Sequence, residues 1–159
     1  MSNIKSLDEI KELRKSFRDA EKKVVFTNGV FDIIHAGHVD YLIKARQSGD
    51  VLIVGMNSDN SVKRIKGENR PIVPESQRAF VLSNLKPVDY VVIFEEDTPA
   101  ELIENLIPDI LIKGADWSLD NIVGKDVVLK NGGDVKTIEF VNSQSTSNIV
   151  QTILERYNR

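Results

Sequence analysis

KVVFTNGVFDIIHAGH, residues 23–38, is the stretch of the sequence that decides the fold. Residues 24–26 are β-branched or aromatic and carry no charge, which predicts a short strand buried on both faces, as in a parallel sheet. A glycine-containing loop follows, and from Gly37 onward apolar residues recur at helical spacing. A strand, a loop and a helix are therefore expected to meet at His35 and His38.

The predicted helix start is suited to binding an anion. The first turn of a helix has unpaired backbone N–H groups and the positive end of the peptide dipole, and both favour a phosphate. Gly37 would let a phosphate approach the backbone, and the imidazoles of His35 and His38 would add hydrogen-bond donors. The junction thus suits phosphoryl chemistry.

Later apolar runs predict the rest of the sheet. They lie at residues 51–56, 89–94, 110–112 and 135–140, with helical patterns between them. This alternation predicts an α/β fold, a Rossmann-like doubly wound sheet of about five parallel strands with helices on both faces.

The segment before the sheet is predicted to be an amphipathic helix. Ser6 and Glu9 have the spacing of a capping box, and apolar residues follow at helical spacing over residues 6–21. We therefore divide the chain into residues 1–22, a helix packed on the domain, and residues 23–159, a single domain that contains the predicted sheet.

Composition limits the possible partners. The 159 residues carry a formal net charge of −3, so no nucleic-acid or membrane surface is expected as the main partner. No cysteine is present, which excludes a disulfide framework, a thiolate zinc site and a cysteine nucleophile. No apolar run is long enough for a signal peptide or a membrane span, and a cytoplasmic protein is expected.

Several polar clusters follow predicted strands. Ligands of open α/β sheets bind at the carboxyl ends of strands, which favours a ligand site at the basic residues near 63–70, although such clusters are often only a solvated face. Residues 113–117, KGADW, follow another strand and form either a turn with a half-buried tryptophan or part of a site. Residues 142–147, NSQSTS, would ordinarily just cap the last helix.

Local patterns give further expectations for the helices. Glu75 and Arg78 are expected to pair on a helix surface. Thr98 and Glu101 are expected to form a capping box with Pro99 at the first helical position. Four apolar residues of the last helix are expected to face the core: Ile149, Val150, Ile153 and Leu154.

The two motifs at residues 28–32, NGVFD, and 35–38, HAGH, resemble the signature of the cytidylyltransferase-like nucleotidyltransferases. The longer string TNGVFDIIHAGHVDYL is most similar to one branch, the bacterial adenylyltransferases that make ADP-heptose from D-glycero-β-D-manno-heptose 1-phosphate. The resemblance runs from about Val24 to about Ile153. Members of that branch occur free or fused behind a sugar kinase, and a lone domain of this size is expected to be the free form.

The resemblance implies a set of nucleotide-binding residues. Residues 143–147 resemble the second family signature, ISSTxxR or ISTTxxK, which holds the β- and γ-phosphates. The chain departs from it, because Gln144 replaces the usual isoleucine and Val150 the usual basic residue. The implied nucleotide-binding residues are Asn28, Gly29, Val30, Phe31, His35, Gly37, His38, Ser143, Ser145, Thr146 and Ser147.

The resemblance also implies residues for the acceptor and for catalysis. The acceptor-binding candidates are Asp32, Lys66, Arg70, Lys113 and Asp116, and the catalytic candidates are His35, His38 and Lys66. With Val150 in place of a basic residue, Lys66, Arg70 and magnesium are the candidates for neutralising the leaving pyrophosphate.

The implied reaction is an in-line displacement at the α-phosphorus of ATP by a sugar phosphate, assisted by positioning and charge stabilisation. Mg²⁺ would be carried by the phosphates rather than by protein side chains. Zinc held by the two histidines and Asp32 is the rival reading, although no further histidine or cysteine exists to complete a closed site. A homodimer is expected, with the N-terminal helix or residues 87–89 as possible contacts.

Two other functions stay open at this point. One is the same chemistry on another pair of substrates, a cytidylyltransferase acting on glycerol 3-phosphate or a similar phosphorylated alcohol. The other is a nucleotide-binding regulator without turnover, against which the retained histidine pair argues, because binding alone would tolerate its loss.

Overall fold

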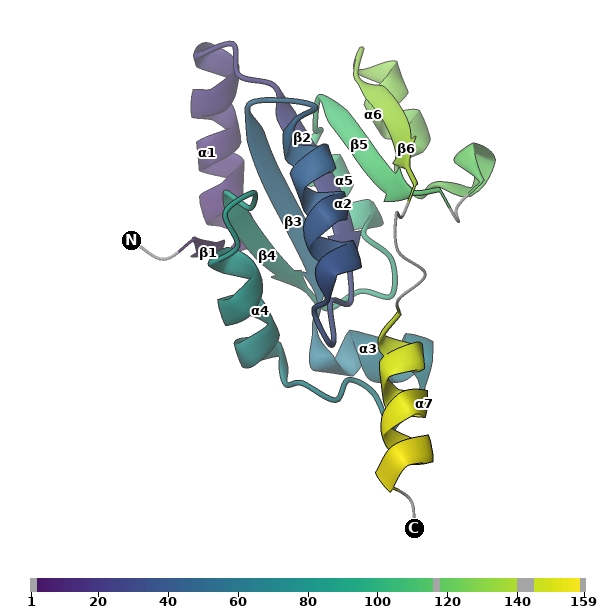
Figure 1. Cartoon of the computed structure of the whole chain (residues 1–159). Coiled ribbons are helices and arrows are strands. Elements are labelled where there is room, and N and C mark those ends of the chain that lie inside the picture. The colour runs from purple at the N-terminus through teal and green to yellow at the C-terminus, as the bar shows by residue number, and fades with distance from the viewer. Residues whose placement is uncertain (1–2, 116–117, 140–144, 158–159) are drawn as a thin grey trace.

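The computed structural model describes residues 3–115, 118–139 and 145–157, which form one parallel sheet with helices on both faces (Figure 1). The strands are β1 (Ile4–Lys5), β2 (Val24–Gly29), β3 (Val51–Asn57), β4 (Tyr90–Phe94), β5 (Ile110–Gly114) and β6 (Asp134–Ile138). The helices are α1 (Leu7–Asp19), α2 (Ala36–Arg46), α3 (Asp59–Lys66), α4 (Glu75–Ser83), α5 (Ala100–Leu106), α6 (Lys125–Lys130) and α7 (Thr146–Tyr157), with a 3₁₀ turn at Leu119–Asn121.

The sheet has the order β1-β4-β3-β2-β5-β6, and every strand pair is parallel. This confirms the predicted doubly wound α/β fold. The sheet holds six strands rather than about five. The additional strand is β1, whose residues Ile4 and Lys5 pair with β4, and two residues are too few to show a strand pattern in the sequence.

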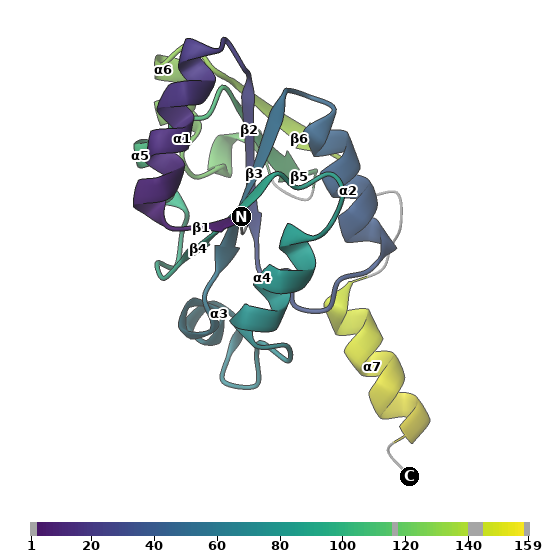
Figure 2. The same cartoon turned by 90° about the vertical axis from the view of Figure 1, so that its left-hand side faces the viewer.

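Alternate side chains of the central strands face two separate core layers. Val24 and Phe26 pack with α1, α5 and α6, whereas Val25 packs with α2 and α4. Figure 2 shows the sheet nearly edge-on, with α1 and α5 on one side and α2 on the other. In the described part of the chain, no helix is both long and apolar enough to cross a membrane.

Aspartates anchor the amino-terminal rim of the sheet. Each of them directly precedes a strand and accepts a hydrogen bond from a backbone N–H at or next to the start of a neighbouring strand. Asp50 accepts from the N–H of Lys23 at 2.8 Å, Asp109 from Val24 at 2.7 Å, and Asp89 from Leu52 at 2.8 Å. These carboxylates hold the strand starts in register at the rim opposite the cavity described below.

The N-terminal helix is fixed at its start and near its middle. The predicted capping box is present, since the Ser6 hydroxyl accepts from the N–H of Glu9 at 3.2 Å and the Glu9 carboxylate accepts from the N–H of Ser6 at 2.8 Å. Further along α1, buried Arg14 donates to the Ile107 carbonyl at 2.9 Å and to Asp109 at 2.8 Å. The helix is thereby tied to the end of α5 and to the rim of aspartates.

Two expectations for the later helices are wrong. Pro99 is the N-cap of α5 rather than its first residue, and no side chain caps that helix, because helical backbone begins only at Ala100. Helix α7 leads away from the body of the protein (Figures 1 and 2), so its apolar face does not reach the core. None of its described residues is buried, and Ile153 and Leu154 are 49% and 51% exposed.

Candidate active site

A cavity of about 800 Å³ lies at the carboxyl ends of β2, β3 and β5. The loop after β2, the first turns of α2, the basic segment after α3 and the start of α7 all contribute to its wall. The predicted site residues on this wall are Asn28, Gly29, Val30, Phe31, Asp32, His38, Lys66, Arg70, Lys113, Ser145, Thr146 and Ser147. Segments more than 100 residues apart in the sequence therefore meet at one opening.

The two histidines stack on each other at the start of α2. His35 is the N-cap residue of that helix, and the ring centroids of His35 and His38 are 3.9 Å apart. The ring of Phe31 lies 5.4 Å from that of His38 on the loop side. His38 reaches the cavity wall, whereas His35 and Gly37 are not part of it in this conformation.

Burial lowers the pKa values of the two histidines. Desolvation lowers the pKa of His35, and desolvation together with the neighbouring His35 lowers the pKa of His38 to about 4. The Nδ1 atoms of both rings are buried and have no hydrogen-bond partner among the described residues. Both lowered pKa values favour the neutral imidazoles at neutral pH.

Asp32 and Arg70 form an ion pair on the cavity wall. The Asp32 carboxylate accepts from Nη1 of Arg70 at 2.7 Å and from the backbone N–H groups of Ile72 and Val73 at 2.9 Å. Burial by itself raises the pKa of Asp32, but the N–H groups of Val73 and Ile72 and the Arg70 guanidinium hold it below its usual range. The carboxylate thus anchors residues 70–73, and Arg70 turns toward the start of α7, where Nη2 lies 3.5 Å from the Ser147 hydroxyl.

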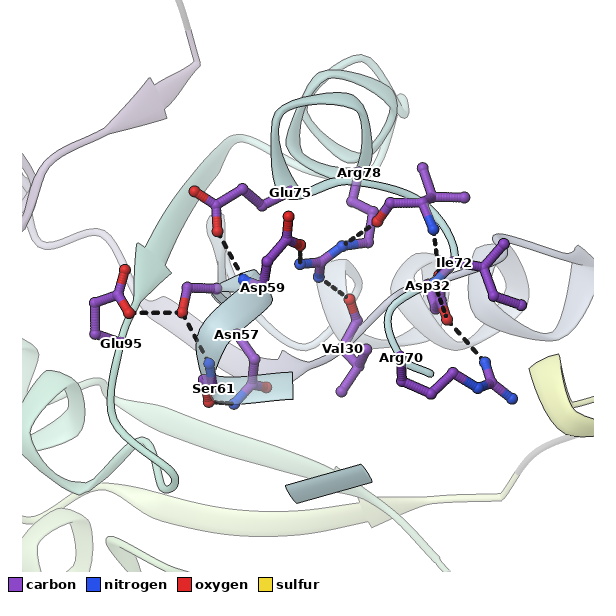
Figure 3. A network of polar contacts seen from close by, with 12 residues as sticks. Val30, Asp32, Asn57, Asp59, Ser61, Arg70, Ile72, Glu75, Arg78 and Glu95 are labelled. Carbon is purple, nitrogen blue, oxygen red and sulfur yellow. Dashed lines mark hydrogen bonds and ion pairs between the residues drawn. The ribbon is translucent and has the colours of Figure 1, made fainter. Parts of the chain in front are cut away.

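The prediction of a surface pair between Glu75 and Arg78 is wrong. Arg78 is only 1% exposed, and its guanidinium donates to the carbonyls of Val30 and Val73 and to the carboxylate of Asp59 (Figure 3). Glu75 instead accepts from the N–H of Asp59 at 2.7 Å. Glu75 and Arg78 are three residues apart in the sequence, but Arg78 binds acceptors from other segments instead of Glu75.

Lys113 lies in the floor of the cavity and is almost fully buried. Its ammonium donates to the side-chain oxygen of Asn28, which brings a cation of β5 next to the end of β2. Tyr41 lines the same cavity, and its hydroxyl lies 2.7 Å from the Thr27 hydroxyl and donates to the Ile112 carbonyl at 3.2 Å. This buried network fixes α2 against β2 and β5.

The serine-threonine turn joins the cavity through its described residues. The hydroxyl of Ser145 accepts from the N–H of Asn148 at 3.1 Å, and the Thr146 hydroxyl lies 3.5 Å from the Ile33 carbonyl. Ser145 therefore caps α7, as the propensity argument expects, while the same turn lines the cavity. Ser143 and Asp116, which were also predicted as site residues, lie outside the described residues.

Other wall residues were missed in the sequence. Asn57 is buried at the end of β3 and donates to the Ser61 hydroxyl at 2.9 Å, which in turn donates to the Glu96 carbonyl at 2.7 Å. The Ser58 hydroxyl also donates to the Glu95 carboxylate at 2.9 Å, and Figure 3 shows Glu95 beside this chain of bonds, which ties α3 to the segment after β4. Within residues 3–115, 118–139 and 145–157, no group of three histidine, aspartate or glutamate side chains could hold a metal ion.

A cavity at the carboxyl rim of a parallel sheet, with a helix start, a histidine and cations on its wall, defines the phosphate-binding class of α/β proteins. Residues 26–153 match the family model described as cytidylyltransferase-like, and the chain belongs to this family of nucleotidyltransferases.

Named relatives agree with this membership. The chain is 58% identical to the bifunctional protein HldE of Campylobacter curvus over 94% of its own length and 31% of the relative. It is 52% identical to the bifunctional protein HldE of Citrifermentans bemidjiense over 98% of its length and 32% of the relative. The chain spans about a third of the length of these relatives.

Solved structures share the fold. The lipopolysaccharide core biosynthesis protein from Thermoplasma volcanium GSS1 matches with a TM-score of 0.63 and 32% identity, over 77% of this chain and 99% of that one. A pantoate-beta-alanine ligase from Francisella tularensis matches with a TM-score of 0.58 over 91% of this chain and 68% of that one. At 15% identity the second match shows a common fold only.

Proposed function

We propose that the protein transfers the adenylyl group of ATP to a sugar 1-phosphate, most specifically D-glycero-β-D-manno-heptose 1-phosphate, giving ADP-heptose and pyrophosphate. The observation that carries this proposal is the meeting of His38, the cations Lys66, Arg70 and Lys113, and the serine-threonine turn at one cavity. The similarity to HldE proteins and to a lipopolysaccharide core biosynthesis protein supports a sugar phosphate as acceptor.

In the proposed reaction a phosphate oxygen of the sugar phosphate forms a bond to the α-phosphorus of ATP. The bond from that phosphorus to the bridging oxygen breaks, and its electron pair leaves with pyrophosphate. The acceptor is already ionised at neutral pH, so no general base is required. Catalysis then consists of positioning the reactants and of stabilising charge on the phosphate oxygens.

The nucleotide would lie along the loop after β2 and the start of α2. Backbone groups of residues 28–31 and Gly37 would bind it, and His35 and His38 would donate to its α- and β-phosphate oxygens. Ser145, Thr146 and Ser147 would hold the β- and γ-phosphates at the start of α7, where backbone N–H groups also favour an anion. A polyanion beside the stacked rings would favour their protonated forms, which donate from both nitrogens.

The acceptor would lie against the cations of the wall. We assign Lys113 and Arg70 to its phosphate, with Asp116 as a further contact, and Lys66 to the leaving pyrophosphate. Asp32 would serve the acceptor indirectly, because its oxygens hold Arg70 and the N–H groups of residues 72 and 73.

Magnesium fits this wall as an ion carried by ATP. The carboxylates Asp32 and Asp97 on the wall are engaged by Arg70 and Arg64, and the other charged groups there are cationic. When bound to the β- and γ-phosphates, magnesium would neutralise the leaving group.

The proposal extends to the setting in which the protein works. ATP and sugar phosphates are cytoplasmic metabolites, so we place the reaction in the cytoplasm. We also propose a homodimer, which the exposed apolar residues Phe80 and Val81 of α4 support, and light scattering of the purified protein tests it.

A panel of substrates tests the proposed reaction. The protein with Mg²⁺ is given ATP or CTP together with heptose 1-phosphate or glycerol 3-phosphate, pyrophosphate release is followed, and the products are identified by mass spectrometry. ATP with heptose 1-phosphate should give the highest kcat/KM and ADP-heptose as product. Faster turnover of CTP with glycerol 3-phosphate would replace this assignment by a cytidylyltransferase, and ATP binding without any pyrophosphate release would indicate a regulator.

A further inference from the structure

Arg78 of α4 is buried and binds groups outside its own helix. Its side chain is fully buried and makes three charge-assisted contacts: Nε to the Val73 carbonyl at 2.9 Å, Nη1 to the Val30 carbonyl at 2.6 Å, and Nη2 to the Asp59 carboxylate at 2.7 Å. A buried guanidinium is costly unless its donors are satisfied, and its planar fork fixes the directions of its partners.

The acceptors of Arg78 belong to the segments that build the cavity wall (Figure 3). Val30 lies in the loop after β2, which lines the cavity. Asp59 begins α3, the helix that ends at Lys66 on the same wall. Val73 follows Arg70 by three residues. Arg78 itself is not a wall residue, so any influence on a ligand must pass through these segments.

The segment of residues 70–73 is held from two sides. The Asp32 carboxylate accepts from the N–H of Val73 at 2.9 Å, and Arg78 donates to the carbonyl of the same residue. Asp32 also binds Nη1 of Arg70 at 2.7 Å. The direction in which Arg70 enters the cavity therefore depends on the contacts of Asp32 and of Arg78 with this segment. We call these contacts the clamp.

We propose that Arg78 is a positioning residue for nucleotidyl transfer: it fixes the segment of residues 70–73, and with it Arg70, against the loop that carries the nucleotide. The expected effect of Arg78 on kcat rests on the proposed function. A displacement of about 1 Å in a charged group at a transfer site costs on the order of 100-fold in rate. Loss of Arg78 should thus lower kcat through Arg70 and not only weaken the fold.

Arg14 provides a matched structural control. It is also a buried arginine that donates to backbone carbonyls, those of Leu106 and Ile107, and to one aspartate, Asp109. It lies at the opposite rim of the sheet and touches no residue of the cavity wall through these contacts. Arg14→Met and Arg78→Met therefore remove similar interactions from different places.

The kinetic experiment compares these variants at a temperature where urea titrations show them folded. Arg78→Met should lower kcat for pyrophosphate release about 100-fold, whereas Arg14→Met should change it by less than about threefold. In an Arg70→Ala background, Arg78→Met should cost less than about threefold further, because the residue through which it acts is gone. Equal effects of the two arginine variants, or full additivity with Arg70→Ala, would overturn the proposal.

Amide hydrogen exchange gives a readout that does not depend on turnover. The amides of Ile72 and Val73 should lose protection at least tenfold in Arg78→Met and keep it in Arg14→Met, while the amides of β3 stay protected in both. If Arg78→Met fails to fold, Asp59→Asn takes its place and should show a smaller change in the same amides. Unchanged exchange at residues 72 and 73 in Arg78→Met would refute the positioning role of Arg78. If the unmodified protein releases no pyrophosphate, the proposed function is refuted instead, and the exchange measurement alone then tests whether Arg78 holds residues 70–73.

Discussion

The pH dependence of stability gives a direct test of the stacked histidines. The pKa of His38 is lowered from 6.5 to about 4 by burial and by the neighbouring His35. Its unfolded form therefore binds a proton at a pH where the folded form does not, and the free energy of unfolding must fall as the pH decreases from the unfolded pKa to the folded one. Above about pH 7.5 both states are neutral and the contribution vanishes.

The size of the effect follows from the two pKa values. Between about pH 8 and pH 5 the shift corresponds to about 2 kcal/mol, and the partial exposure of the ring reduces this to roughly 1 kcal/mol. His35 acts in the same direction, since burial lowers its pKa as well. Because these are the only two histidines in the chain, no other imidazole contributes to the change.

Urea unfolding of the wild type and of His38→Gln at several pH values measures this effect. Glutamine stays neutral, so the variant should lose roughly 1 kcal/mol less between about pH 8 and pH 5 than the wild type does. Contributions that are common to both proteins cancel in the difference. An equal or larger loss in His38→Gln would show that the folded protein tolerates the protonated ring, and the argument from burial would be refuted.

Three further predictions concern single side chains. His35→Ala should lower the rate of pyrophosphate release by about 100- to 1,000-fold with ATP affinity in calorimetry changed far less, and an unchanged rate would contradict the donor role. Gly55→Ala should lower the free energy of unfolding by about 1–3 kcal/mol in urea titrations, because a Cβ there would lie 2.8 Å from Cζ of Phe26. Ser6→Ala removes the cap of α1 and should cost about 1 kcal/mol in the same titration without altering kcat; a loss of activity with intact stability would assign Ser6 another role.

Much of the fold could be predicted because it depends on local patterns. The uncharged apolar run at residues 24–26 predicted a strand buried on both faces, and Val24 and Val25 are in fact buried in opposite layers. The spacing of Ser6 and Glu9 likewise predicted a cap that is formed within four consecutive residues. Such features are determined by neighbours in the sequence.

The features that could not be predicted depend on partners far along the chain. The acceptors of Arg78 at Val30 and Asp59 lie 48 and 19 residues away, and nothing in the helix itself distinguishes this arginine from a surface residue. The apolar stripe of α7 predicted burial, but the direction in which that helix leaves the body determines what its side chains can reach. The resemblance to the family located most of the cavity wall, yet it missed Tyr41 and Asn57, which also line the cavity.

The two rims of the sheet differ in what their residues do. Asp50, Asp89 and Asp109 secure the strand starts at one rim, while the cavity lies at the other, a full strand length away. Substitutions near these carboxylates are therefore expected to change the temperature of unfolding more than they change kcat. Engineering for stability would therefore target the rim that carries the aspartates. Engineering for a different substrate would target the opposite rim.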